Sequence, residues 1–138
     1  MATGPSLRKL ESHHSIHEGA LVEARDLTLL VERLARDEKV NDCLKAAKTL
    51  VEHWETRVIA HADAEEDGFY QEILEGNPKM AKEIHMLTRD HDLIRMITAT
   101  IKKQLAERKV TKEVIDQFQS LLIINKIHSN SEEDMLLT

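Results

Sequence analysis

Hydrophobic positions recur at steps of three and four along most of the chain, which is the period of one face of an α-helix. The pattern predicts four helices. The first can begin at Ser6, a plausible N-cap, and it ends at the polar stretch 37–42, where Asn41 or Asp42 is available to cap the second helix. Its predicted inward positions are Leu10, His13, His17, Ala20, Ala24, Leu27, Val31 and Leu34.

The second predicted helix runs to about Leu74, and Gly76-Asn77-Pro78 ends it because Pro78 suits only the first turn of a helix. The third ends near Arg108 and Lys109, and Thr111 can cap the fourth. Their inward positions are Ala47, Val51, Trp54, Val58, His61 and Glu65; then Ile84, Leu87, His91, Ile94, Thr98, Ile101 and Leu105; then Val114, Phe118, Leu121, Ile124, His128 and Glu132.

Four helices with short connections predict an all-α fold, an up-and-down antiparallel four-helix bundle. The bundle is expected over residues 6–138, after a flexible N-terminal tail at residues 1–5. A chain of 138 residues suits one domain. Aromatic residues make up only 3% of it, and 4 Gly and 2 Pro are few, so the composition also favours helix over sheet.

The charges and the single cysteine narrow the possible partners and location. The formal charge is −6 and basic residues are scattered among acidic ones, so nucleic acid is not expected as a partner. No apolar run approaches the ~20 residues that span a membrane. Cys43 alone cannot form an intrachain disulfide, and the first residues lack the apolar segment of an export signal, so a cytoplasmic protein is expected.

A histidine followed four residues later by a glutamate occurs twice, as His61 with Glu65 and as His128 with Glu132. Residues four apart lie on the same side of a helix, so an imidazole nitrogen and a carboxylate oxygen can converge on one ion. A single pair of this kind is usually a surface contact. The duplication on two inward faces changes that interpretation.

The hairpin connections place the other inward histidines at the same height. His17 and His61 are each 22 residues from Lys39, so the first two helices bring them face to face. The same reflection about residues 109–110 pairs His91 with His128. Imidazole and carboxylate together suit iron, manganese or zinc, and two glutamates able to bridge suggest a two-metal centre. The alternative is a polar network in the core.

Two His-x-x-x-Glu-Glu motifs, each preceded by a helix with an inward histidine, resemble the hemerythrin-like, or HHE, cation-binding domains over roughly residues 13–137. The resemblance implies a bundle holding two non-haem iron ions joined by an oxo or hydroxo bridge. In that family pattern Glu65 and Glu132 match the bridging carboxylates. The positions that match terminal ligands are His17, His61, His91 and His128.

The chain departs from oxygen-carrying hemerythrins on the third helix, where two histidines one turn apart are expected. Leu87 and Arg95 stand one turn before and after His91, so one expected ligand is missing there. His13, one turn before His17, can replace it from the first helix as a ligand or as a partner of one. The ferritin-like di-iron motif has the opposite order, Glu-x-x-His, and is set aside.

The remaining polar candidates are expected to have supporting roles. His14 is predicted to be solvated or structural, and His53 and His85 to be packing or surface residues. Glu66 and Glu133 rotate about 100° away from the ligands that precede them, which favours outer contacts. Tyr70 is expected to fill the end of the bundle rather than to approach the metal.

The first function expected is a metal protein that binds a small ligand such as dioxygen or nitric oxide for sensing, storage or delivery. A closed ligand set without an obvious substrate pocket favours binding over catalysis. An enzyme reducing peroxide or nitric oxide, or an iron- or redox-responsive regulator, are the alternatives. The sequence identifies no protein partner.

Overall fold

The computed structural model describes residues 10–137, and this part of the chain is helical without a β-strand, so the prediction of an all-α fold is confirmed. The predicted N-cap Ser6 and the tail 1–5 lie outside the described residues. The elements are α1 Leu10–Arg36, α2 Val40–His53, η2 Trp54–Ile59, α3 Ala60–Ala64, η3 Glu65–Phe69, α4 Tyr70–Gly76, η4 Pro78–Met80, α5 Ala81–Leu105 and α6 Lys112–Leu136.

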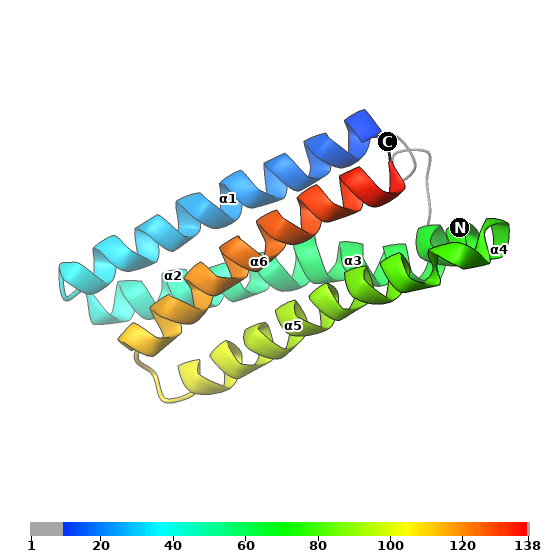
Figure 1. The fold of residues 1–138 in the computed structure, drawn as a ribbon. Coiled ribbons are helices and arrows are strands. Elements are labelled where there is room, and N and C mark those ends of the chain that lie inside the picture. The colour runs from blue at the N-terminus through cyan, green and yellow to red at the C-terminus, as the bar shows by residue number, and fades with distance from the viewer. Residues whose placement is uncertain (1–9, 138) are drawn as a thin grey trace.

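The elements form four long rods that lie side by side (Figure 1). The second rod is continuous from α2 to α4, and the others are α1, α5 and α6. The turns between α1 and α2 and between α5 and α6 lie at one end, and the start of α1 and the end of α6 lie at the other (Figure 1). Helix α1 packs against α2 and α6, and α5 packs against α6 and α2.

The interior consists of two apolar clusters. The larger includes Trp54, Ile101 and Phe118, each completely buried. The smaller is built around Phe69, Tyr70, Ile84 and Leu87. On α5, His91 lies between Leu87 of the smaller cluster and Ile94 of the larger one, and the buried polar side chains are therefore held between two apolar layers.

The second rod contains two π-helical segments, η2 and η3, in which the backbone hydrogen bond spans five residues rather than four. Each widens the turn and shifts the residues that follow around the helix axis. Adjacent residues are buried at both segments, His53 with Trp54 and Phe69 with Tyr70. The sequence pattern did not predict either segment.

Two helix ends differ from the predictions. The expected cap at Asn41 or Asp42 is wrong, because α2 begins at Val40 and Lys39 makes no side-chain capping bond. Instead the turn tightens through backbone bonds from Glu38 and Lys39 to the end of α1, with Glu38 at φ 56°. Helix α5 ends at Leu105, before the predicted Arg108.

Two other predicted ends are confirmed. Pro78 occupies the first turn of η4, and the Asn77 side chain accepts a hydrogen bond from the Lys79 amide. The Thr111 hydroxyl accepts a hydrogen bond from the Val114 amide at 3.2 Å, so this threonine caps α6. The second rod extends to Gly76, slightly past the predicted Leu74. Within residues 10–137, no helix is both long and apolar enough to cross a membrane.

Candidate metal centre

The structure brings the seven predicted ligand residues together in one interior layer. They form two groups, and in each group one nitrogen or oxygen atom per residue lies within 4.8 Å of those of the other members. Both groups contain Glu65, the first residue of η3. The first group is His13, His17, His61 and Glu65, and the second is Glu65, His91, His128 and Glu132.

The two oxygens of Glu65 face different groups. Oε2 lies 3.6 Å from His61 Nε2 and 3.9 Å from His13 Nδ1, both in the first group. Oε1 lies 3.4 Å from His91 Nε2 in the second group. The carboxylate therefore spans the space between the two sets of imidazoles.

Glu132 spans the same space from α6. Its Oε1 lies 3.2 Å from His13 Nδ1 and 3.2 Å from His17 Nε2. Its Oε2 lies 3.5 Å from His128 Nε2, one helical turn earlier. Each glutamate thus presents one oxygen to each group, which is the arrangement that a bridging carboxylate requires.

Several of these buried atoms have no hydrogen-bond partner. They are both ring nitrogens of His13, Nε2 of His61, Oε2 of Glu65 and Oε1 of Glu132. His13, Glu65 and Glu132 are at most 1% exposed, so their side chains are closed off from bulk solvent. A buried unsatisfied polar atom costs roughly 1–3 kcal/mol. These buried His and Glu groups could hold a metal ion, which would satisfy the same atoms.

Carboxylates outside the layer orient three of the imidazoles. The Nδ1 atoms of His17, His91 and His128 lie 3.2 Å from Glu133, 2.7 Å from Glu66 and 2.9 Å from Asp90, respectively. When Nδ1 donates its proton to a carboxylate, the inward Nε2 keeps its lone pair for a metal. Such outer contacts were predicted for Glu66 and Glu133, whereas Asp90 was not among the predicted residues.

Arg95 holds the outer contact of His91 in place. Its guanidinium donates to Glu66 at 2.6 Å and to Asp63 at 2.6 Å, and it also donates to Asp92 at 2.9 Å. Arg95, one helical turn after His91, therefore positions Glu66. The completely buried ring of His13, on α1, also enters the centre.

The prediction that Tyr70 only fills the end of the bundle is wrong. Its hydroxyl donates a hydrogen bond to Glu132 Oε2, and its ring stacks on His91 with centroids 5.6 Å apart and planes at 4°. Tyr70 follows Glu65 by five residues, and the π turn of η3 brings the two residues to the same side. In a regular α-helix this spacing would separate them by more than a quarter turn.

The two glutamates have opposite electrostatic states. Burial, together with the nearby Glu132 carboxylate, raises the pKa of Glu65 well above its usual value. Burial acts in the same direction on Glu132, but close contacts with the imidazoles of His128, His13 and His17 outweigh it and hold the pKa of Glu132 well below its usual value. Without a cation, the pKa values of the two carboxyls are therefore shifted in opposite directions.

The pKa values of the buried histidines are also shifted in different directions. Burial lowers the pKa of His61 to about 4, and burial together with His128 lowers the pKa of His91 to about 3. Burial would lower the pKa of His128 as well, but hydrogen bonds to Asp90 and Glu132 outweigh it and raise that pKa to about 9. His61 and His91 are therefore neutral near pH 7, the form in which an imidazole binds a metal.

The other histidines lie outside this layer. His14 is exposed, and its Nδ1 lies 3.0 Å from Glu133. His53 is buried and donates from Nε2 to the Ala20 carbonyl at 2.9 Å, so it is a packing residue, as expected. His85 is exposed on α5. Comparisons of the chain with protein-family models, with curated proteins and with solved structures found no match.

Proposed function

We propose that the chain is a hemerythrin-like protein, an up-and-down antiparallel four-helix bundle that holds two non-haem iron ions. The observation that carries the proposal is the pair of glutamates, each with one oxygen toward each group of histidines. A site for one ion needs no such sharing. The donor set fits the group, because imidazole and carboxylate ligands suit iron, with manganese and zinc as the other candidates.

The two groups offer unequal numbers of imidazoles. Three, from His13, His17 and His61, face the first group, and two, from His91 and His128, face the second. With both glutamates shared, an ion in the second group would have one protein donor fewer than an ion in the first, which favours the second group as the place where a small ligand binds. We propose that this ligand is a diatomic molecule such as dioxygen or nitric oxide, bound for sensing, storage or delivery.

Bound iron would supply the change in oxidation state that accompanies binding of such a ligand. The protein's own groups do the rest. The apolar layers on either side exclude water, and the carboxylates of Glu66, Asp90 and Glu133 hold the imidazoles in one orientation. The Tyr70 hydroxyl holds Glu132 from the second group's side.

One observation favours a second candidate, an enzyme that reduces peroxide or nitric oxide at the same centre. Such an enzyme needs an acid beside the metal, and the buried Tyr70 hydroxyl donates a hydrogen bond to Glu132 of the second group. Burial, with Glu65 and Glu132 nearby, raises the pKa of Tyr70, so the phenol keeps its proton. A regulator that loosens when metal leaves is a third candidate, since ligation energy is also folding energy.

Metal analysis and optical spectroscopy test the proposal. Protein purified from iron-replete cells is expected to contain two irons per chain, with near-ultraviolet or visible bands that change reversibly with dioxygen or nitric oxide. Steady consumption of added peroxide or nitric oxide would favour the enzyme. A protein that takes up at most one ion per chain, or none, contradicts the two-metal centre.

A further inference from the structure

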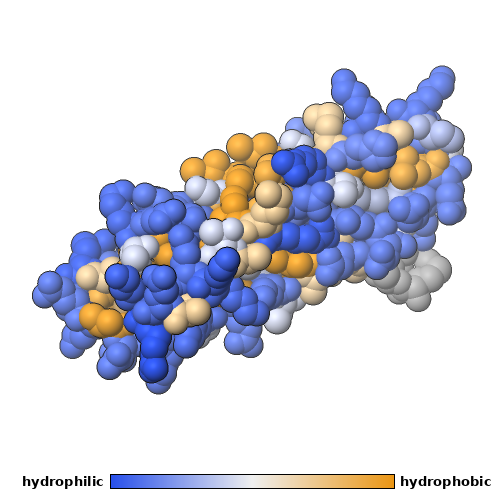
Figure 2. Space-filling view, turned by 90° about the horizontal axis from the view of Figure 1, so that it is seen from below, coloured by the Kyte–Doolittle hydropathy of each residue, from blue (hydrophilic) through white to orange (hydrophobic). Residues whose placement is uncertain are grey.

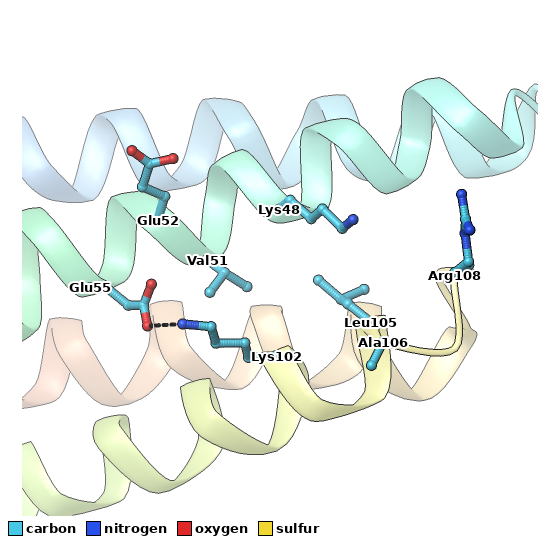
Figure 3. Close-up of a pocket in the computed structure, with 8 residues that line it drawn as sticks. All are labelled: Lys48, Val51, Glu52, Glu55, Lys102, Leu105, Ala106 and Arg108. Carbon is cyan, nitrogen blue, oxygen red and sulfur yellow. Dashed lines mark hydrogen bonds and ion pairs between the residues drawn. The ribbon is translucent and has the colours of Figure 1, made fainter.

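A second hollow lies apart from the metal centre, between α2 and the end of α5 (Figure 3). Its volume is about 590 Å³, within the usual range for small-molecule sites of roughly 300–1,000 Å³. Lys48 on its wall precedes His61 by 13 residues, about 20 Å at the rise of a helix. We call this hollow the cleft, and it is lined by Lys48, Val51, Glu52, Glu55, Lys102, Leu105, Ala106 and Arg108.

The charges in this cleft are separated along its length. At one end Lys102 donates to Glu55 at 3.0 Å, so these two charges cancel, and Glu52 lies on the same side (Figure 3). At the other end the Lys48 ammonium extends toward Leu105, and Arg108 reaches toward α2 from the turn after α5 (Figure 3). Between these ends lie the apolar side chains of Val51 and Leu105.

The two cations at that end differ from Lys102 in lacking a partner among the described residues. Within residues 10–137, neither the Lys48 ammonium nor the Arg108 guanidinium forms an ion pair or a side-chain hydrogen bond. Exposed lysines and arginines are often solvated in this way. Here, however, the two come from different elements and both border the same apolar surface of Val51 and Leu105.

The backbone of Arg108 supplies an independent observation. Its φ is 65°, in the left-handed region that glycine adopts easily and that costs other residues energy. The position follows the end of α5, and the Arg108 amide donates to the Leu105 carbonyl at 3.0 Å. A glycine would make the same turn with less strain, and strained residues concentrate at functional sites. What the arginine adds is a guanidinium over the cleft.

We propose that this cleft binds a small monoanion with an apolar body, such as a straight-chain monocarboxylate. The carboxylate lies between Lys48 and Arg108, where charge-assisted hydrogen bonds from both cations reach it. The hydrocarbon body lies over Val51, Leu105 and Ala106. At the far end of the ligand the Lys102–Glu55 pair is neutral and Glu52 leaves a net negative charge, so dicarboxylates of the same length are disfavoured.

Titration of the full chain with octanoate, followed by amide NMR spectra, tests this site. Saturable shifts are expected at the amides of Leu105 and Ala106. Octanedioate, of equal length, and octylamine, of opposite charge, are expected to bind several-fold more weakly. Equal or tighter binding of octanedioate overturns the proposal, as do octanoate shifts confined to other parts of the molecule.

Arg108→Gly separates binding from folding. It removes the cation but suits the left-handed backbone, so its melting temperature should equal or exceed that of the unmodified chain. Its affinity for octanoate should fall by about two- to fivefold, the scale of one exposed ion pair. Lys48→Ala should weaken binding similarly, and Arg33→Ala on α1, outside the cleft, should leave it unchanged. Unaltered affinity in both Arg108→Gly and Lys48→Ala refutes the assignment.

Discussion

Removing metal from the centre should destabilise the whole fold, and the structure sets the size of the effect. Five buried ring nitrogens and carboxylate oxygens lack hydrogen-bond partners in the metal-free layer. At roughly 1–3 kcal/mol for each such atom, their combined cost is about 5–15 kcal/mol. That equals the total stability of an ordinary domain, also about 5–15 kcal/mol. The metal-free chain is therefore expected to be only marginally folded.

The assay is thermal unfolding followed by circular dichroism at 222 nm, with iron-loaded protein compared with the same protein after chelation. In a chain of this size about 1 kcal/mol corresponds to about 4 °C in melting temperature, so the low end of the range predicts a loss of about 20 °C. Part of this difference depends on the free metal concentration, because a ligand stabilises the folded state according to its concentration and affinity.

Glu65→Gln is the matched control, because it keeps the shape of the side chain but removes the charge of a group shared by both histidine sets. Chelation should change its melting temperature little, since less metal is bound at the outset. The reasoning is refuted if the unmodified chain melts within about 3 °C with and without metal, a difference worth under ~1 kcal/mol. Such a result would mean that water satisfies the buried atoms.

Four further outcomes are expected. His61→Ala should sharply lower the iron content measured by plasma emission spectrometry, and His53→Ala should not, because His53 bonds a carbonyl instead. Asp90→Asn should lower iron affinity about 10–100-fold in chelator competition, the usual effect of losing the partner of a ligand histidine. Tyr70→Phe should retain iron but slow any reduction of peroxide, and unchanged turnover would exclude Tyr70 as the acid. The metal-free chain should melt highest near pH 6.5, measured by calorimetry. The His61 pKa of about 4 makes stability fall as pH drops below 6.5, and the His128 pKa of about 9 makes it fall as pH rises from 6.5 through 9.

The inward position of the seven clustered residues follows from helical periodicity, which is why the sequence could predict it. His61 and Glu65 share a helix face because they are four residues apart. The common height of His17 and His61 follows from their equal distance to the turn near Lys39, and a turn of few residues leaves little freedom to change it. Such local and symmetric relations are contained in the spacing of the residues.

Tyr70 and Asp90 could not be predicted in the same way. Tyr70 reaches Glu132 only because η3 contains a wider turn, and propensity and period do not distinguish a π turn from an α turn at Glu65. Asp90 precedes His91 by one residue and is attached to a different helix from its partner His128. That contact depends on the packing of α5 against α6, which no pattern within one helix encodes.

The helix ends likewise include one feature that local sequence predicts and one that it does not. The Thr111 cap was predictable because the threonine side chain bonds an amide only three residues away. The start of α2 was not, because its turn is built from backbone bonds of Glu38 and Lys39 to the end of α1, and Glu38 takes a left-handed conformation that its sequence does not favour.

The wide turn at η3 also fixes the angular phase of everything that follows it on the second rod. Each residue advances an α-helix by about 100°, so deleting one residue from this turn would swing α4 by that angle about its own axis. Phe69 and Tyr70 could not then both face inward, and the apolar layer that closes this end of the molecule would lose its contacts with Ile84 and Leu87. A single-residue deletion in η3 would therefore expose the apolar layer at this end of the molecule to solvent.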